Sequence, residues 1–209
     1  MSRLLPKVQV FFMNKSSSGC RQPHPHTLKQ LGWTDEFSRA FSKYSGPYIP
    51  GRVACRQKTV WEVFIDNGSV IAGISGALRR LDRFPAVGDF VVLLHQPEAG
   101  SSTIVDILPQ NTVFTRGASG REGTDQVIAA NIDMVFIVTA AGHDLNARRI
   151  ERYLAIAHAS GARPVIVINK SDLADDPALL TEEILPVASG IPVIPVSAIS
   201  GEGIDRLEP

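Results

Sequence analysis

Two uninterrupted apolar segments in the second half of the chain most strongly constrain its fold. Residues 134–140 and 164–168 show no alternation of polar and apolar side chains, which is typical of strands buried on both faces. A helical pattern lies between them, with Asn146 as its expected N-cap and Gly161 as its terminator. A third strand, 192–196, follows a second helical segment. Strand–helix–strand–helix–strand with short connections predicts a parallel, doubly wound α/β sheet.

The preceding stretch has a different pattern, because its β-rich segments are short and separated by turns. Asp66-Asn67-Gly68 is a strong tight-turn sequence,. A break over 77–84 lies where a barrel of the OB type has its connecting helix or loop. We therefore expect a small closed barrel, with strands at 51–57, 59–65, 69–75, 90–95 and 103–108.

Composition fits an ordinary globular protein, with 44% hydrophobic and 20% charged residues among 209,. No apolar run approaches the roughly 18 residues needed to cross a bilayer, and the N-terminus has no apolar stretch of signal-peptide length. Cys20 and Cys55 are not in metal-ligand spacing. The sequence therefore predicts a reduced, cytoplasmic protein with no membrane partner.

The formal net charge of zero hides an asymmetry between the two parts of the chain. Residues 1–58 contain ten Lys or Arg and only two acidic residues, so this segment carries +8 and the remainder −8. The excess indicates either a solvated basic face or an electrostatic footprint for a phosphate backbone. Within residues 1–50 we expect a partly disordered leader and one short helix between Leu28 and Tyr44, with Thr34 as its N-cap.

Polar residues follow two of the predicted strands at the point where each strand ends. Asn169, Lys170 and Asp172 follow the strand 164–168, and Ser197-Ala198 follows the strand 192–196. The carboxyl ends of parallel strands form the ligand-binding edge of such sheets. An ionised Asp172 can accept two hydrogen bonds from the ring N–H and exocyclic amine of guanine. Adenine lacks this donor pair, so the two loops predict selective binding of guanine.

The other members of this site have simpler roles. Asn169 can hydrogen-bond to the purine edge or tie the two loops together. Lys170 can lay its aliphatic stem over the base plane, and the Ala198 N–H can donate to the guanine carbonyl. A single Asn-Lys-x-Asp is often only a surface turn, but here both motifs end apolar strands, which favours a nucleotide site.

The order of several further motifs resembles the ribosome-small-subunit-dependent GTPases. These are circularly permuted GTPases in which the guanine-binding motif precedes the P-loop. The resemblance covers the chain from about Gly51 to its end, on Gly51–Val53, Ser75–Arg80, Val87–Asp89, Ile107–Pro109, Arg116, Gln126–Asp133, Arg148–Leu154, Asn169–Asp172 and Ser197–Gly203. It implies an OB-fold β-barrel followed by part of a circularly permuted, P-loop GTPase-like α/β domain. It also implies a monomeric GTP hydrolase that binds GTP or GDP and acts on the small (30S) ribosomal subunit and its rRNA late in assembly.

On this resemblance we expect a leader at 1–50, an RNA-binding barrel at 51–116 and the guanine-binding half of the GTPase domain at 117–209. The family's P-loop, switch regions and zinc-binding domain fall after residue 209. No G-x-x-x-x-G-K-[ST] occurs in this sequence, and Gly117-x-x-Gly120-x-x-Gly123 has no lysine for a phosphate,. We therefore expect no catalytic residue, no Mg or Zn ligand and no hydrolysis by this chain alone. The alternative is a non-catalytic RNA- or ribosome-binding module with a vestigial GTPase half.

Five basic residues of the barrel are the expected contacts to the RNA backbone, namely Arg52, Arg56, Lys58, Arg79 and Arg80,. Trp61 is expected in the barrel core, with a stacking platform for bases as the alternative. Gln110-Asn111 stands where relatives usually carry basic residues, so one phosphate contact is expected to be missing. His143 and His158 are expected to be a loop and a helix-face residue without catalytic roles.

Overall fold

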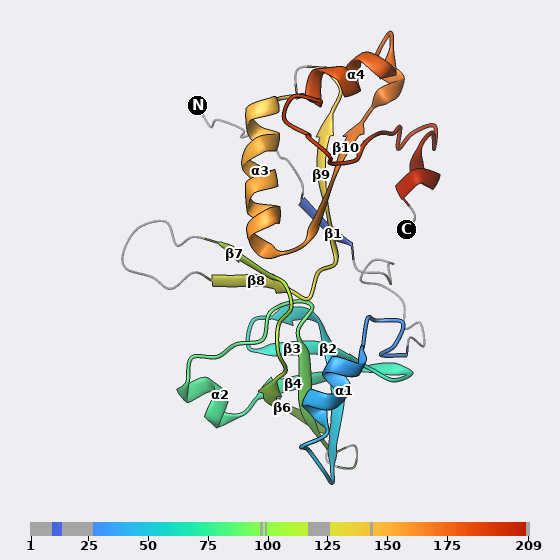
Figure 1. Cartoon of the computed structure of the whole chain (residues 1–209). Helices are drawn as coiled ribbons and strands as arrows, with labels where there is room; N and C mark the ends of the chain where they lie inside the picture. Colours follow the sequence, from blue (N-terminus) through green and yellow to red (C-terminus); the bar gives the residue numbers. More distant parts are fainter. Residues whose placement is uncertain are drawn as a thin grey trace, which may run out of the picture. The chain divides into compact units, whose positions relative to one another are not determined.

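The chain forms two units, which we describe separately (Figure 1). The barrel unit comprises Asn14–Ile132, and the sheet unit comprises Met1–Met13 and Asp133–Pro209. The computed structural model describes residues 10–13, 27–96, 98, 100–116, 126–142 and 144–207; for 10–13, 101, 116, 126 and 177 only the backbone is described. Residues 1–9 and 14–26 of the expected leader, the stretch 117–125 with its three glycines, and His143 therefore lie outside the described residues.

The barrel unit contains the predicted five-stranded closed barrel. Its strands follow the order β2-β3-β4-β6-β5, and all pairs are antiparallel except β4 with β6. One glycine is required by a close approach, because a Cβ at Gly51 would lie 2.6 Å from Val63 Cγ1. The strands are β2 (Tyr48–Gln57), β3 (Val60–Ile65), β4 (Gly68–Ile74), β5 (Phe90–Gln96) and β6 (Ser101–Ile107).

Alternating side chains of these strands fill the barrel. Val63, Ala72 and Ile104 are completely buried, and Trp61 is 1% exposed. Each large apolar side chain buried in this way contributes roughly 1.5–3 kcal/mol. The predicted break between the third and fourth strands contains α2 (Gly76–Arg80). Its N-cap residue accepts a hydrogen bond from the backbone of Leu78, the side chain of which packs into the same core.

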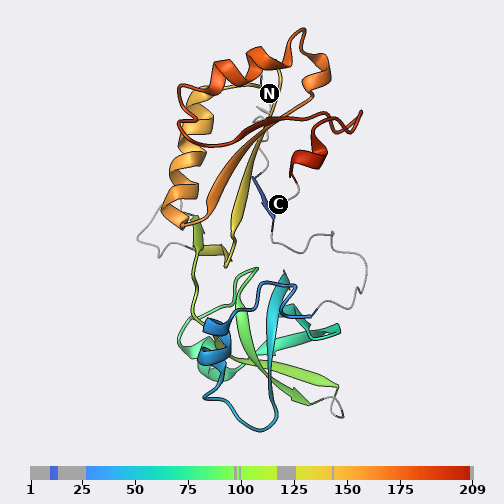
Figure 2. The same cartoon turned by 45° about the vertical axis from the view of Figure 1, so that its right-hand side comes forward.

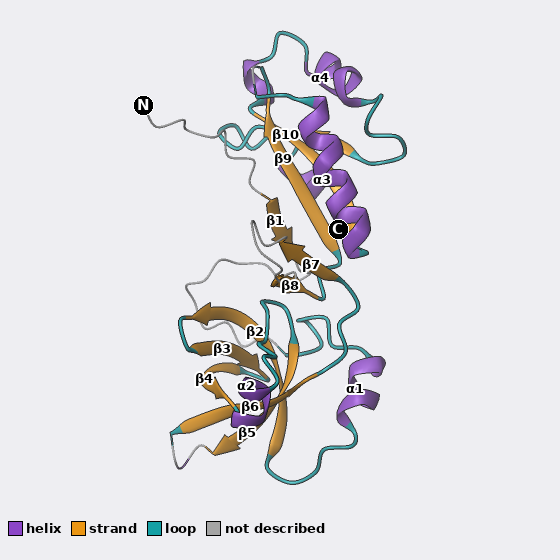
Figure 3. Cartoon of the chain, turned by 90° about the vertical axis from the view of Figure 1, so that its left-hand side faces the viewer, coloured by secondary structure: helices purple, strands orange, loops and turns teal. Residues whose placement is uncertain are grey.

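A short helix, α1 (Asp35–Phe41), covers the outside of the barrel, as Figure 3 shows. It lies within the predicted range but is shorter, and the Thr34 side chain makes no capping hydrogen bond although it holds the N-cap position. The helix is anchored by aromatic packing, since the rings of Phe37 and Phe90 lie 4.3 Å apart between centroids. This small aromatic cluster fixes α1 against β5.

The barrel unit ends in a hairpin that the periodicity did not predict. β7 (Val113–Arg116) pairs with β8 (Gln126–Ala130) in antiparallel register. The Thr112 hydroxyl closes the base of the hairpin, because it donates to the carbonyl of Ile132 at 2.9 Å and accepts the N–H of the same residue. Both strands are too short for a clear alternation of polar and apolar residues.

The sheet unit confirms the parallel α/β prediction. β9 (Met134–Ala140), β10 (Arg163–Asn169) and β11 (Val193–Pro195) are parallel neighbours. A fourth strand, β1 (Val10–Met13), adds antiparallel to β9 and was not predicted. The resulting sheet has the order β1-β9-β10-β11. Figure 2 shows β1 in blue on one side of β9 in yellow and β10 in orange on the other.

Helices cover both faces of this sheet. α3 (Ala147–Ser160) begins where predicted, since Asn146 Oδ1 accepts the Arg149 N–H at 3.0 Å, and it ends at Gly161, the φ of which is +84°. α4 (Pro177–Ile184) follows β10, and two 3-10 helices, η2 (Ser171–Leu173) and η3 (Ile204–Leu207), flank it along the chain. Leu207 of η3 packs against the β9–β10 surface around Val165. No described helix is long and apolar enough to span a membrane.

Candidate functional site

The ends of β10 and β11 bring the two predicted loops to one edge of the sheet. β10 ends at Asn169 and β11 at Pro195, and the strands are parallel, so both chains leave the sheet at the same edge. Backbone hydrogen bonds continue the pairing beyond the strands. The Ser171 N–H donates to the carbonyl of Val196 at 3.1 Å. The two loops therefore have a fixed relative position.

Asn169 is the side chain that joins these loops. Its Oδ1 accepts the Lys170 N–H at 2.8 Å and the Ala198 N–H at 3.1 Å. Of the two roles considered for this residue, the structure contains the link between the loops. The Ala198 N–H is thus already engaged, and a guanine carbonyl at this position would share or replace the bond to Asn169.

Lys170 has an unusual backbone conformation for a residue with a side chain. Its φ and ψ are +61° and +37°, in the left-handed region, and it precedes η2. This conformation costs roughly 1 kcal/mol for a residue other than glycine. The turn lets the next residue, Ser171, become buried while Lys170 and Asp172 on either side stay exposed. The strained turn therefore presents the two charged members of the motif to solvent.

The carboxylate of Asp172 is available for a ligand. The residue is exposed and forms no hydrogen bond or ion pair with any described residue. Polar groups without protein partners at a strand-end edge are those that remain to bind a ligand. The arrangement can offer a bidentate acceptor for two adjacent N–H donors.

The Ser197 loop is rigid at its base. Ser197 is fully buried, its N–H donates to the carbonyl of Glu202 at 2.9 Å, and its Oγ accepts the Ser200 N–H at 3.2 Å. Gly203 fits a tight approach, because an added Cβ would lie 2.5 Å from the Pro195 carbonyl oxygen and its φ is +72°. Ser197 thus stabilises the loop from its buried side, whereas Ala198 lies at the exposed surface.

Comparison with known proteins identifies the family. A model described as RsgA GTPase matches residues 107–209. The small ribosomal subunit biogenesis GTPase RsgA of Methanosarcina acetivorans is 55% identical over 193 residues, which cover 92% of this chain and 52% of that protein. The protein of the same name from Opitutus terrae is 41% identical over 196 residues, 88% of this chain and 53% of that protein. The chain belongs to the RsgA GTPase family. It spans about half the length of these curated RsgA relatives.

Two solved structures have a similar fold. YjeQ from Thermotoga maritima matches with a TM-score of 0.62 at 24% identity, over 77% of this chain and 56% of that one. YloQ, a circularly permuted GTPase, matches with a TM-score of 0.55 at 19% identity, over 73% of this chain and 52% of that one. The predicted fold class, an OB-fold barrel followed by part of a permuted GTPase-like domain, is thereby confirmed.

One of the predicted RNA contacts does not fit its position in the barrel unit. Arg52 is only 3% exposed. Its guanidinium donates to the carbonyl oxygens of Gly88, Leu31 and Asn131, and it lies 4.9 Å from the centroid of the Phe90 ring. These bonds join β2 to three other segments of the unit. Arg52 is therefore a structural residue, and a contact from it to an RNA phosphate is incompatible with this burial.

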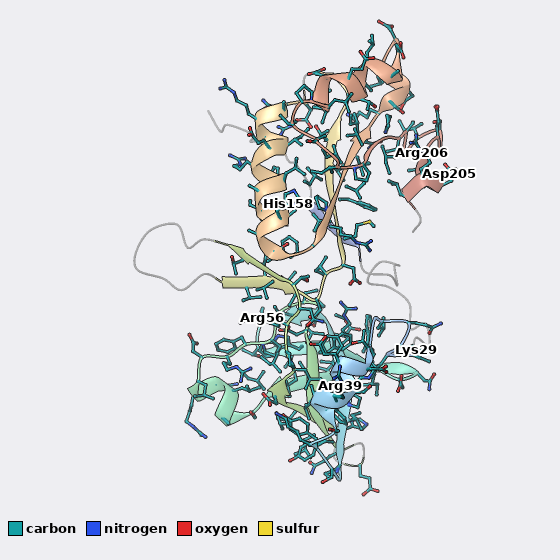
Figure 4. The ribbon with its side chains drawn as sticks, viewed as in Figure 1. Lys29, Arg39, Arg56, His158, Asp205 and Arg206 are labelled. Carbon is teal, nitrogen blue, oxygen red and sulfur yellow. The ribbon has the colours of Figure 1, made fainter. Side chains whose placement is uncertain are left out.

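The other four predicted cations lie at the surface, namely Arg56, Lys58, Arg79 and Arg80. Figure 4 shows Arg56 apart from Lys29 and from Arg39 of α1. Trp61 is in the barrel core as expected, where its Nε1 donates to the Pro85 carbonyl at 2.9 Å. His158 is an exposed residue of α3, also as expected.

Two further residues of the barrel unit, Asp89 and Phe84, were given no role of their own in the sequence analysis. Asp89 is completely buried and accepts the Ala86 N–H at 2.8 Å and the Gln110 amide N–H at 2.7 Å. Burial raises the pKa of Asp89 to about 6, against the hydrogen bonds and the positive charges of Arg52 and Arg83, which lower it. Phe84, 39% exposed, was taken as part of a connecting loop. Gly88-Asp89 could be recognised as a motif in the sequence, but the burial of Asp89 could not be predicted from it.

The described residues offer no metal site. Among them, no group of three or more His, Cys, Asp or Glu side chains could hold an ion. Ligands for the Mg and Zn of the full-length family were not expected in this chain, and no step below is derived through a metal.

Proposed function

We propose that this chain supplies the guanine-binding half and the RNA-binding barrel of a GTPase that acts in biogenesis of the small ribosomal subunit. The relatives at 55% and 41% identity carry that name. The observation that carries the nucleotide part is the Asn169 bridge between the two strand-end loops, beside the unpartnered carboxylate of Asp172. We further propose that the protein is cytoplasmic and monomeric and that it binds the subunit through its rRNA.

Selectivity for guanine follows from hydrogen-bond complementarity at Asp172. The ionised carboxylate accepts from the ring N–H and the exocyclic amine of guanine. Adenine presents no such pair, and a carboxylate desolvated by the base without a donor costs several kcal/mol. The Lys170 stem covers one face of the base, while Asn169 keeps the Ala198 backbone at the height of the guanine carbonyl.

Phosphate handling is not part of this chain's proposed role. The printed sequence has no G-x-x-x-x-G-K-[ST] to cradle the β- and γ-phosphates,. We therefore infer that the 209 residues bind guanine nucleotides through the base and do not hydrolyse them alone. Binding by this half is expected to be weak, because the phosphates supply much of the affinity of nucleotide sites.

The barrel contributes the proposed RNA contacts. Arg56, Lys58, Arg79 and Arg80 are exposed and are suited to phosphate contacts, which position a protein on RNA without reading its sequence. Each phosphate contact contributes to the salt dependence of binding. Replacing Arg79 and Arg80 together is therefore expected to weaken RNA binding and flatten its dependence on salt.

The test of the nucleotide proposal is titration of the chain with fluorescent GDP and ADP analogues. The wild type should bind the GDP analogue more tightly, and Asp172→Ala should weaken it by roughly 100-fold, as expected for the loss of two charge-assisted hydrogen bonds. Asp175→Ala is the matched control, since Asp175 is an exposed acid in the same segment. Equal losses for guanine and adenine analogues would rule out the role proposed for Asp172.

A further inference from the structure

A groove of about 1000 Å³ lies in the barrel unit. Its walls are the loop after α2, from Leu81 to Pro85, and the end of β6 from Asp106 to Gln110. Lys43, Arg56 and Val127 complete it. The volume is at the upper end of the range of about 300–1,000 Å³ typical of small-molecule sites. None of the residues expected to bind guanine belongs to this groove.

An exposed aromatic ring forms part of the groove wall. Phe84 is stacked on Trp61, with ring centroids 6.5 Å apart and an angle of 13° between the planes. Trp61 is buried, whereas Phe84 is 39% exposed. The Arg56 guanidinium lies 5.2 Å from the Trp61 centroid and 5.4 Å from the Phe84 centroid. Packing on the barrel core therefore holds a partly exposed aromatic platform in a fixed orientation.

Three cations and two acids line the groove. Lys43, Arg56 and Arg83 line the groove and are exposed. Asp106, on the opposite wall, is already engaged: its carboxylate accepts the Tyr44 hydroxyl and the Ile107 N–H, and it lies 3.7 Å from Arg83. Lys43 and Arg56 form no ion pair with a described residue. Asp82 also lines the groove and forms no ion pair with a described residue. Three cations and two acids therefore give the groove a net charge of +1 beside its aromatic face.

We propose that this groove binds an unpaired nucleotide of RNA, with its base stacked on Phe84 and its flanking phosphates at Lys43 and Arg56. Bases of single-stranded RNA stack on aromatic side chains and on arginine planes, while basic side chains follow the backbone. An acidic peptide would use the cations but would leave the aromatic face without a planar partner. The inference rests on the proposed RNA-binding function and names the element of RNA that is bound.

The test measures binding of the full 209-residue chain to two fluorescein-labelled RNAs, an unstructured 12-nucleotide strand and a 12-base-pair duplex. A 2-aminopurine in the middle of a second single strand reports stacking through quenching of its fluorescence. Phe84→Ala removes the platform, Phe84→Leu keeps an apolar cover on Trp61 without a ring, and Phe84→Tyr keeps the ring. Ile71→Ala, at a 54% exposed position on β4, is the matched control. Melting temperatures show which variants are folded.

The expected result is preference for the single strand and quenching of 2-aminopurine. Phe84→Ala and Phe84→Leu should each weaken binding of the strand by roughly 5- to 100-fold, whereas Phe84→Tyr and Ile71→Ala should stay within about 2-fold of the wild type. Lys43→Ala should weaken binding and reduce its salt slope.

Two results would overturn the groove assignment while leaving RNA binding intact. One is unchanged affinity of Phe84→Leu together with a large loss in the Arg79→Ala/Arg80→Ala variant. The other is loss of binding to 30S subunits by Phe84→Leu without any loss for isolated RNA, which would indicate a protein partner. Failure of the wild type to bind either RNA or 30S subunits would instead contradict the proposed function itself.

Discussion

The loops at the edge of the sheet unit and the surface of the barrel unit differ in what determines their side chains' positions. At the sheet edge, Asn169 is the last residue of β10 and Ala198 follows the end of the parallel strand β11, so topology alone brings them together. In the barrel, Arg52 and Arg56 lie on the same strand, yet one is buried and the other exposed. The strand's place in the closed barrel decides which arginine meets solvent. Sites in strand-end loops are therefore easier to infer than surfaces made of strand side chains.

The sharpest test of this difference is replacement of the two kinds of arginine. Arg52→Ala leaves the buried carbonyls of Leu31 and Asn131 without the donor that Arg52 supplies, and the Gly88 carbonyl with the Asn131 amide alone. Each buried carbonyl without a donor costs about 1–3 kcal/mol. We expect the barrel unit to lose roughly 3 kcal/mol or more in its free energy of unfolding. Arg79→Ala, at an exposed site, should change it by less than about 0.5 kcal/mol,. Urea denaturation measures both. If both variants changed the free energy of unfolding by similar, small amounts, the distinction between buried and exposed arginines would be wrong.

The pH dependence of stability is a second test of the contrast between buried and exposed side chains, because the barrel unit contains the buried carboxyl of Asp89. The pKa of Asp89 is about 6 in the folded chain against 3.8 for the free side chain. The folded state therefore binds this proton more tightly than the unfolded state does. As a result, the contribution of Asp89 to the free energy of unfolding falls as the pH rises from about 4 to 6, and it stays low above pH 6.

When the pH is lowered from 7 to 4.5, the free energy of unfolding of the wild type should increase by on the order of 2 kcal/mol relative to that of Asp89→Asn. The comparison with this variant isolates the contribution of Asp89 from those of the other acids. Parallel stability curves for the two proteins over this range would show that Asp89 ionises normally.

The sheet edge should show smaller effects on stability and measurable ones on binding. Asn169→Ala removes the acceptor of two backbone N–H groups, and we expect about a 10-fold loss of guanine affinity, since each such bond contributes roughly 1 kcal/mol,. Amide hydrogen exchange at Ala198 should become faster. Ser200→Ala is the control within the same loop, where the hydroxyl accepts only the Glu202 N–H, at 3.3 Å. Unchanged exchange at Ala198 would show that the bridge does not hold the loops.

Much of the fold followed from the sequence because its local patterns agree with the final structure. β9 and α3 have the predicted bounds, and the caps at Asn146 and Gly161 are those expected. The five barrel strands were also found from turns and β-rich segments. β1 and the β7–β8 hairpin were missed, because strands of four or five residues show too little periodicity, and pairing of β1 with β9 spans more than 120 residues.

The functional residues divide in the same way. The link from Asn169 to the Ala198 loop was among the roles expected, since strand order brings those residues together. The burial of Arg52 and the exposure of Phe84 could not be predicted, because both depend on how the barrel closes. Trp61 illustrates the difficulty: the sequence marks an aromatic residue, but only packing shows that Phe84, stacked on it, is the ring that meets solvent.

The most direct test of the account is the nucleotide preference of Asp172→Asn. An asparagine keeps one acceptor and replaces the other with a donor, which matches xanthine, where a carbonyl stands in place of the guanine amine. Titration of wild type and variant with fluorescent GDP and XDP analogues should show guanine preference in the wild type and a shift toward xanthine in the variant. An unchanged preference for guanine would contradict the assignment of Asp172 as the group that recognises the base.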